Sequence, residues 1–134
     1  MATHTIWIYA KKDLPYPLSI SDDEGHLSTT ESASKELTTE LVNGDLVKWV
    51  IHPLSDITAI VNIEESKTKI YDMKVVLPIF KTLPAPTNDG DGSWSAEMQM
   101  PDNYIKATSE YTITYTVNGQ NYTQDPKLQI RKKN

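Results

Sequence analysis

Runs of alternating apolar and polar residues, separated by turn residues, constrain this chain more than any other feature of its sequence. The most regular run covers residues 110–117, where every second residue is apolar. A period of two is that of a half-buried β-strand, and the Asn118-Gly119 pair that follows is typical of a two-residue hairpin turn. We therefore expect a hairpin whose first strand faces the core. Its inward residues should be Tyr111, Ile113, Tyr115 and Val117.

A second well-defined run follows the Asn43-Gly44 pair, which also predicts a hairpin turn. Beyond this turn, Val47, Trp49 and Ile51 share one side of the expected strand. Large aromatic side chains bury the most apolar surface. Trp49 is therefore the expected centre of the core.

Shorter runs predict the remaining strands. Residues 3–10 have apolar side chains on both sides, which indicates a strand covered on both faces. The prolines within residues 11–17 should end it, because proline cannot donate to a ladder. Further strands are expected at 18–20, 57–63, 94–100, 120–123 and 128–130, with Ile57, Ala59, Val61 and Ile63 facing inward. Residues 32–41 are the one candidate for a helix.

This pattern predicts the fold class. About seven to nine short strands, with turn signals at intervals of roughly ten residues, are typical of a β-sandwich. We therefore expect an all-β, antiparallel Greek-key sandwich. A length of 134 residues suits one core, so residues 1–134 should form a single domain.

Charge and cysteine content exclude several classes of function. Lys and Arg number 13 against 18 Asp and Glu, for a net charge of −5, so nucleic acid is not an expected partner. The absence of cysteine excludes disulfides, Cys-based zinc sites and a thiol nucleophile. The longest apolar run, residues 75–80, is too short to span a membrane. No signal peptide is visible, so the chain as it stands is expected in the cytoplasm, unless its sequence was trimmed.

Two of the expected strands resemble those of plastocyanin-like cupredoxins. That family has a Gly-Asp-x-Val-x-Trp/Phe strand followed by a histidine loop, and residues 44–52 read Gly-Asp-Leu-Val-Lys-Trp-Val-Ile-His. Its late Gly-x-Tyr-x-Tyr-x-Cys strand and its closing strand are similar to residues 109–117 and 128–130. The resemblance implies a cupredoxin-like sandwich, while an immunoglobulin-like sandwich has a similar strand pattern.

The chain departs from that family at the metal site. A blue-copper site needs two imidazoles and a thiolate, with a weak axial ligand such as Met. The chain has no cysteine, and residues 118–122 read Asn-Gly-Gln-Asn-Tyr. We therefore exclude a blue-copper site and expect no cofactor. His52 lies where the family carries a copper histidine, but we expect a structural or solvent-facing role.

Two acidic turns are candidates for ion binding. Asn88, Asp89 and Asp91 lie in a loop with part of the spacing of a calcium loop, but the sixth and twelfth positions do not fit an EF-hand. We interpret it as a flexible turn and keep an irregular calcium loop as the alternative. The other turn holds Asp22, Asp23, Glu24 and His26, a cluster that could bind a divalent ion. A solvated acidic turn is the favoured interpretation there, and His4 is isolated in the sequence.

Aromatic side chains suggest a second kind of site, because their faces stack on sugars. Most fall on inward sides of the expected strands and should belong to the core. The candidates for an exposed ligand surface are Trp7, Tyr9, Tyr16, Tyr104 and Tyr122.

No motif for a nucleophile, a metalloprotease or a phosphate loop is present. We therefore expect a non-enzymatic β-sandwich domain that binds another protein or associates with itself. The alternative is a module that binds a carbohydrate or small ligand, assisted by calcium through the Asp89 loop.

Overall fold

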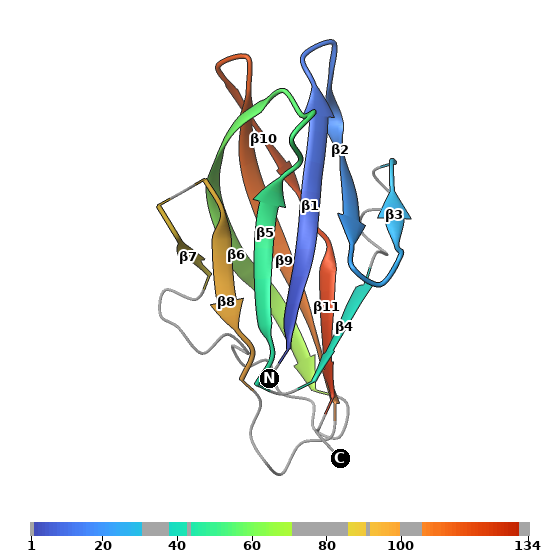
Figure 1. Ribbon diagram of the computed structural model, residues 1–134. Helices are drawn as coiled ribbons and strands as arrows, with labels where there is room; N and C mark the ends of the chain where they lie inside the picture. The colour runs from blue at the N-terminus through green and yellow to red at the C-terminus, as the bar shows by residue number, and fades with distance from the viewer. Residues whose placement is uncertain are drawn as a thin grey trace.

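The computed structural model describes residues 2–30, 38–42, 44–70, 86–90, 92–99 and 106–131. These residues form eleven strands in two sheets and contain no helix. The sheets face each other as a sandwich (Figure 1), which confirms the all-β sandwich. The described residues contain no helix that is long and apolar enough to cross a membrane.

The first sheet has six strands in the order β3-β2-β1-β5-β8-β7. Its members are β1 (Thr3–Lys11), β2 (Leu14–Asp22), β3 (Leu27–Ser28), β5 (Leu46–Ile51), β7 (Thr87–Asn88) and β8 (Trp94–Glu97). The outermost strands, β3 and β7, have two residues each. Most of the outer edge of β2 therefore has no partner strand among the described residues.

The second sheet has five strands, and β9 lies at its centre. One edge of β9 pairs with β6, and the other pairs with β10 and then β11, while β4 pairs with β11. The strands are β4 (Thr38–Val42), β6 (Ile57–Ile70), β9 (Lys106–Val117), β10 (Gln120–Gln124) and β11 (Lys127–Arg131). β10 and β11 pair with successive parts of the same edge of β9, so together they form one interrupted strand.

Both sheets are mixed, whereas the sequence led us to expect antiparallel pairing throughout. β1 runs parallel to β5, and β4 runs parallel to β11. The hairpin predicted from Asn43-Gly44 does not form, because β4 and β5 belong to different sheets; Asn43 itself lies outside the described residues. Gly44 has φ +96° and the Asp45 amide donates to the Val42 carbonyl at 3.0 Å, so the chain does reverse there. Turn chemistry fixes the reversal but not which strand becomes the partner.

The core between the sheets is centred on Trp49 and Tyr111, as expected. Their rings lie 5.4 Å apart at 61°, and the indole Nε1 donates to the Tyr111 Oη at 3.1 Å. Burial raises the pKa of Tyr111 far above its ordinary value, so it stays neutral. The Trp94 indole donates to the Ile60 carbonyl across the same core at 3.2 Å. Buried indole and phenol groups thus have partners, which lets them lie in the core at little cost.

The inward side of β6 was predicted wrongly in part. Ile57 and Ile63 are buried as expected, but Ala59 and Val61 are exposed and Ile60 is buried instead. Register shifts occur between residues 57 and 59 and between residues 60 and 62. Each shift resets the alternation, because an extra residue turns the following side chains to the other face.

Two other expectations need correction. β2 begins at Leu14 instead of residue 18, because Pro15 and Pro17 lie where β3 does not reach and their missing N–H groups interrupt no ladder there. Trp7 and Tyr9 are only partly buried, so β1 is not fully covered on both faces. Of the helix candidate, residues 38–41 belong to β4 and residues 32–37 lie outside the described residues.

Candidate functional site

Turns gather at the two ends of the sandwich (Figure 1). The apolar end consists of the β1–β2 turn, the loop of residues 52–56 and the β9–β10 turn. The carboxylate–histidine end lies where β1 and β5 begin and β2 stops. It comprises His4, Asp22, Asp23, Glu24, His26 and Asp45. The candidate residues from the sequence divide mainly between these ends.

At the apolar end, His52 organises a tight turn. Its carbonyl accepts the Ser55 amide at 2.9 Å, and its Nδ1 accepts the Leu54 amide at 3.1 Å. The imidazole also packs edge-on against Tyr9, with ring centroids 5.5 Å apart. Pro53 occupies the second position of the turn, where its fixed φ is favourable. These contacts place His52 within the structure of the turn.

The same turn is attached firmly to the end of β1. The Ser55 Oγ accepts the Ala10 amide at 3.0 Å, and the Asp56 amide donates to the Ala10 carbonyl at 2.8 Å. The Lys11 Nζ donates to the Leu54 carbonyl at 2.8 Å and lies 5.6 Å from the centre of the Tyr9 ring. The loop is therefore held by hydrogen bonds instead of by burial of its own side chains.

Large apolar side chains project from this end into solvent. Leu54 is 68% exposed, Leu14 is 64% exposed and Tyr16 is 36% exposed. Leu14 is the register partner of Lys11, whose ammonium contacts the Leu54 backbone. Lys11 thus lies between the two exposed leucines.

Two of the aromatic candidates border the same end. Tyr122 stacks on Tyr115 with ring centroids 5.8 Å apart, and the Tyr115 Oη donates to the Pro15 carbonyl at 2.7 Å, next to Tyr16. Burial and the neighbouring Tyr16 and Tyr122 raise the pKa of Tyr115. The structure therefore brings both Tyr16 and Tyr122 close to Tyr115. Trp7 lies elsewhere, in the middle of β1, and Tyr104 lies outside the described residues.

The candidate calcium loop satisfies its own polar groups. The Asn88 Oδ1 accepts the Gly90 amide at 2.8 Å, and the Asp89 carboxylate accepts the hydroxyls of Ser93 and Ser95 at 3.2 and 2.7 Å. Asp91 lies outside the described residues. Asn88 and Asp89 thus support the β7–β8 hairpin.

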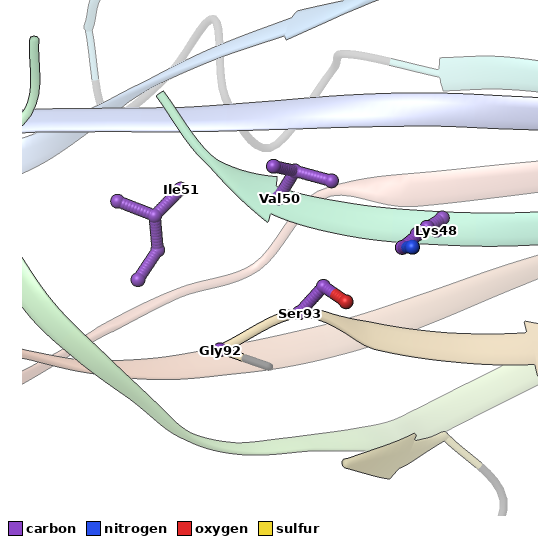
Figure 2. Close-up of a pocket in the computed structure, with 5 residues that line it drawn as sticks. All are labelled: Lys48, Val50, Ile51, Gly92 and Ser93. Atoms are coloured by element: carbon purple, nitrogen blue, oxygen red, sulfur yellow. The ribbon is translucent and has the colours of Figure 1, made fainter. Parts of the chain in front are cut away.

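A small open pocket lies beside this hairpin, on the outer side of the first sheet (Figure 2). Its volume is about 200 Å³, and it is lined by Lys48, Val50, Ile51, Gly92 and Ser93. It lies where β5 continues beyond Trp49, the last residue paired with β8. None of the five lining residues carries a carboxylate or an imidazole, and the one titratable side chain among them is that of Lys48.

At the opposite end, Asp22 is the centre of a hydrogen-bonded network. Its side chain is buried, and its Oδ2 accepts the Thr39 hydroxyl at 2.8 Å and contacts the His26 Nδ1 at 2.7 Å. Its Oδ1 accepts the amides of Glu24 and His26 at 3.0 and 2.9 Å. The sequence suggested a solvated turn, but Asp22 is buried and joins the β2–β3 turn to β4.

This network shifts three pKa values. Burial alone would raise the pKa of Asp22, but the hydrogen bonds from His26, Thr39 and two amides lower it below its ordinary value. The bond to Asp22 and the charges of Asp22, Glu24 and Glu40 raise the pKa of His26. Burial and the charge of Asp22 raise the pKa of Glu24. The anionic Asp22 and the cationic His26 thus stabilise each other.

Asp45 forms a second network beside the first. Its carboxylate accepts the amides of Ala2 and Val42, each at 3.0 Å, and lies 3.0 Å from the His4 Nε2. Burial would raise the pKa of Asp45, but these hydrogen bonds lower it. The other ring nitrogen of His4 lies 3.3 Å from Asp23. His4 therefore joins Asp23, in the β2–β3 turn, to the Asp45 network.

Asp22, Glu24 and His26 form the one group within the described residues whose ligand atoms are close enough for a metal ion, all within 4.8 Å. Hydrogen bonds already engage these atoms. His52 is not part of such a group.

A family model for a domain of unknown function, DUF8788, matches residues 4–123. The chain belongs to this family. Both ends of the sandwich lie within the matched residues. No curated protein matches the sequence.

Sequence reasoning missed the importance of Asp45, Leu14 and Leu54. Asp45 was read as part of the Gly-Asp strand motif, although an acidic residue after an Asn-Gly turn is a signal for capping nearby amides. The two leucines carry no sequence signal of exposure.

Proposed function

We propose that this domain is a non-enzymatic binding module that contacts a partner protein through its apolar end. The observation that carries the proposal is the exposed Leu54 on a turn held in place by hydrogen bonds. Single exposed leucines are ordinary on protein surfaces. Here two leucines and Tyr16 gather at one end, on segments that are already ordered.

A rigid apolar group is favourable for binding because little conformational entropy is lost when a partner covers it. The turn of residues 52–55 is closed by its own hydrogen bond and tied to Ala10 and Lys11. Leu54 is therefore presented in one backbone conformation. Burying a leucine side chain contributes about 1.5–3 kcal/mol to association.

The charges of this end indicate the chemistry of the partner. Lys11, Lys12 and Asp13 are exposed there, and the partly exposed Asp56 carboxylate accepts the Lys12 amide. The charge nearest to Leu54 is the Lys11 ammonium, which donates to the Leu54 carbonyl. A partner that presents an apolar side chain flanked by carboxylates would match both features. The opposite end, which is rich in carboxylates, would repel the same partner.

Strand addition at the sheet edges is a less favourable way to bind. The long edge strand β6 has three register shifts, and the outer edge of β2 contains Pro15 and Pro17. Bulges and prolines both disrupt the row of backbone groups that an added strand would need. Interaction through loops at an end of the sandwich is therefore favoured.

We also propose that the sandwich is cupredoxin-like without a copper site. The two motifs that carry the resemblance become β5 and β9, and they meet in the core through Trp49 and Tyr111. The parallel pairs β1–β5 and β4–β11 favour it over an immunoglobulin-like sandwich, whose sheets are antiparallel. The β9–β10 connection is a two-residue turn with positive φ at Asn118 and Gly119, which leaves no loop for ligands.

The binding proposal can be tested with a displayed random-peptide library selected on the immobilised domain. We expect enriched peptides to combine a large apolar residue with Asp or Glu. The double substitution Leu14→Ser and Leu54→Ser should weaken the selected peptides at least about tenfold, the equivalent of 1.4 kcal/mol. Isothermal titration calorimetry with synthetic peptides measures this change.

Leu27→Ser is the matched control, because Leu27 is 70% exposed but lies on β3, away from the apolar end. It should leave peptide affinity unchanged. Equal binding by all variants would refute the proposed surface. Concentration-dependent light scattering that Leu54→Ser abolishes would instead indicate self-association through the same end.

A carbohydrate module is the second candidate, favoured by Tyr16 and Tyr122 around Tyr115 at the same end. Quenching of tryptophan and tyrosine fluorescence by a glycan panel would test it. Binding that is lost in Tyr16→Ala and Tyr122→Ala, with Trp7→Ala as a control, would support this candidate over a protein partner.

A further inference from the structure

The first sheet is interrupted where β5 continues beyond the start of β8. The pairing of these two strands ends at Trp49 and Trp94, although β5 extends to Ile51. The residues that precede Trp94 are Ser93 and Gly92, and Gly92 has φ +93°. Extended strands have negative φ, so a residue with this φ cannot continue one. The chain therefore turns away from β5 at Gly92, and the small open pocket of Figure 2 lies at that point.

The backbone groups of Ile51 point toward this interruption. The amides of Leu46, at the start of β5, and of His52, directly after it, both donate toward β1 at 2.8 Å. Backbone groups alternate in direction along a strand, so the even-numbered residues of β5 bond to β1 and the odd-numbered residues to β8. Ile51 is odd-numbered, and no residue of β8 lies opposite it. Its N–H and C=O therefore have no backbone partner within the described residues.

A positive charge lies beside the same pocket. Lys48 lines it and is partly buried, and its ammonium forms no ion pair with any residue of the described ranges. Lys48 lies opposite Ser95, whose hydroxyl donates to the Asp89 carboxylate at 2.7 Å. That carboxylate also accepts the Ser93 hydroxyl, so two serines engage it. The pocket therefore combines a backbone donor, a backbone acceptor and a cation.

We propose that this pocket binds a C-terminal residue, of a peptide or of an N-acylated amino acid, through its amide N–H and its free carboxylate. Two residues opposite one another in an antiparallel pair exchange two hydrogen bonds. The ligand N–H donates to the Ile51 carbonyl, and one carboxylate oxygen accepts the Ile51 amide. The second carboxylate oxygen accepts the Lys48 ammonium. Hydrogen bonds between two charged groups are stronger than neutral ones, which favours a carboxylate over an uncharged end.

The direction of β8 explains why the bound group must be a carboxyl terminus. A ligand that pairs antiparallel with β5 runs in the same direction as β8, so a further residue would collide with Ser93 and Trp94. The ligand must therefore end opposite Ile51, with its carboxylate on the side of Lys48. A ligand that ran in the opposite direction would place a terminal ammonium there, and Lys48 would repel it.

The size and the apolar wall of the pocket limit the ligand further. Its volume of about 200 Å³ suits a single residue. Val50 and Ile51 form the apolar part of the wall, and Ile51 packs against the core. Side chains directly opposite in an antiparallel pair lie on the same side of the sheet. The ligand side chain would therefore lie beside Ile51, and an apolar residue such as valine is expected.

Titration of the isotope-labelled full chain with N-acetylvaline, followed by two-dimensional NMR, tests the site. We expect the Ile51 amide signal to shift, with the weak affinity of a small ligand. N-acetylvalinamide, which has no charge at its end, should bind at least about tenfold more weakly. A peptide that ends in valine distinguishes the two sources of such a residue. Binding tighter than that of N-acetylvaline indicates a protein C-terminus, and equal binding indicates a small acylated amino acid.

Variants of the charged group complete the test. Lys48→Met removes the charge but keeps a long side chain, so it should weaken N-acetylvaline at least about tenfold and leave N-acetylvalinamide unchanged. Lys48→Arg should retain carboxylate binding. Lys12→Met is the matched control, because Lys12 is exposed at the apolar end. The double variant Leu14→Ser, Leu54→Ser should also bind N-acetylvaline like the wild type, which separates this site from the one proposed at the apolar end.

Three results would overturn the proposal. They are equal affinity for N-acetylvaline and N-acetylvalinamide, wild-type affinity in Lys48→Met, and an Ile51 amide signal that does not move up to about 50 mM N-acetylvaline.

Discussion

At the apolar end, hydrogen bonds fix a turn whose apolar side chains are exposed to solvent. At the carboxylate–histidine end, hydrogen bonds stabilise charged side chains that are buried. Leu54 is 68% exposed on a turn whose backbone is bonded to β1, while Asp22 is 5% exposed and accepts four hydrogen bonds. The comparison teaches that, at these two ends, the polarity of a side chain does not decide whether it is buried. The hydrogen bonds available to it and to its backbone do. One end is suited to contact a partner, and the other to hold the fold.

Removal of the central carboxylate should give the largest effect. We expect Asp22→Ala to lower the free energy of unfolding by about 3 kcal/mol, because it leaves Thr39, His26 and two amides without their acceptor. Asp22→Asn should restore part of the loss. Urea denaturation measures both changes.

The matched control lies at the other end. Asp56 is partly exposed, and its carboxylate accepts one amide, from Lys12, at 2.9 Å. Asp56→Ala should cost about 1 kcal/mol or less. Equal losses for the two substitutions would contradict the proposed difference between the ends.

Lowering the pH should destabilise the fold through the carboxylate–histidine end, with a smaller effect than the Asp22→Ala substitution. The pKa values of Asp22 and Asp45 lie below 3.8, so these groups stabilise the fold above that pH, and the contribution is lost as the pH falls through their folded values. Glu24 has a raised pKa and acts in the opposite direction. The contributions of Asp22, Asp45 and His26 are all present between about pH 3.8 and 6.5, and Glu24 moves the highest Tm toward the lower part of this range.

Differential scanning calorimetry from pH 2.5 to 5 measures the acid side. The variant Asp22→Asn, Asp45→Asn should show a shallower loss of Tm than the wild type. An unchanged slope would show that these carboxylates do not govern acid stability.

Tyr115→Phe should give the smallest effect and probes the apolar end. It removes the bond from Oη to the Pro15 carbonyl, which ties β9 to β2, and should cost about 1 kcal/mol. Tyr122→Phe removes an exposed bond to Gln120 and should change stability by less than about 0.5 kcal/mol. Chemical denaturation compares the two, and a larger effect at Tyr122 would contradict the order.

Much of the strand pattern could be predicted because it depends on local alternation. In β9 the side chains of Tyr111, Ile113 and Tyr115 face the core as expected, and Asn118-Gly119 forms the expected turn. In β6 the same reasoning failed at Ala59 and Val61. A register shift depends on the partner strand, and the sequence of one strand does not show it.

The candidate sites show the same division. The acidic turn from Asp22 to His26 is visible in the sequence because its members lie within five positions. The bridge from His4 to Asp45 joins residues 41 positions apart and depends on the parallel pairing of β1 with β5. No local pattern predicts such a pair.

The sequence by itself determined that the chain forms strands, which sides of β5 and β9 are apolar, and that no thiolate can bind copper. These properties depend on neighbouring residues or on composition. Only the tertiary structure decided that β4 and β5 belong to different sheets, that Asp22 is buried and that Leu54 is exposed. The physical reason is that burial and pairing depend on which distant segments meet, and the chain forms those contacts only when its two sheets pack together.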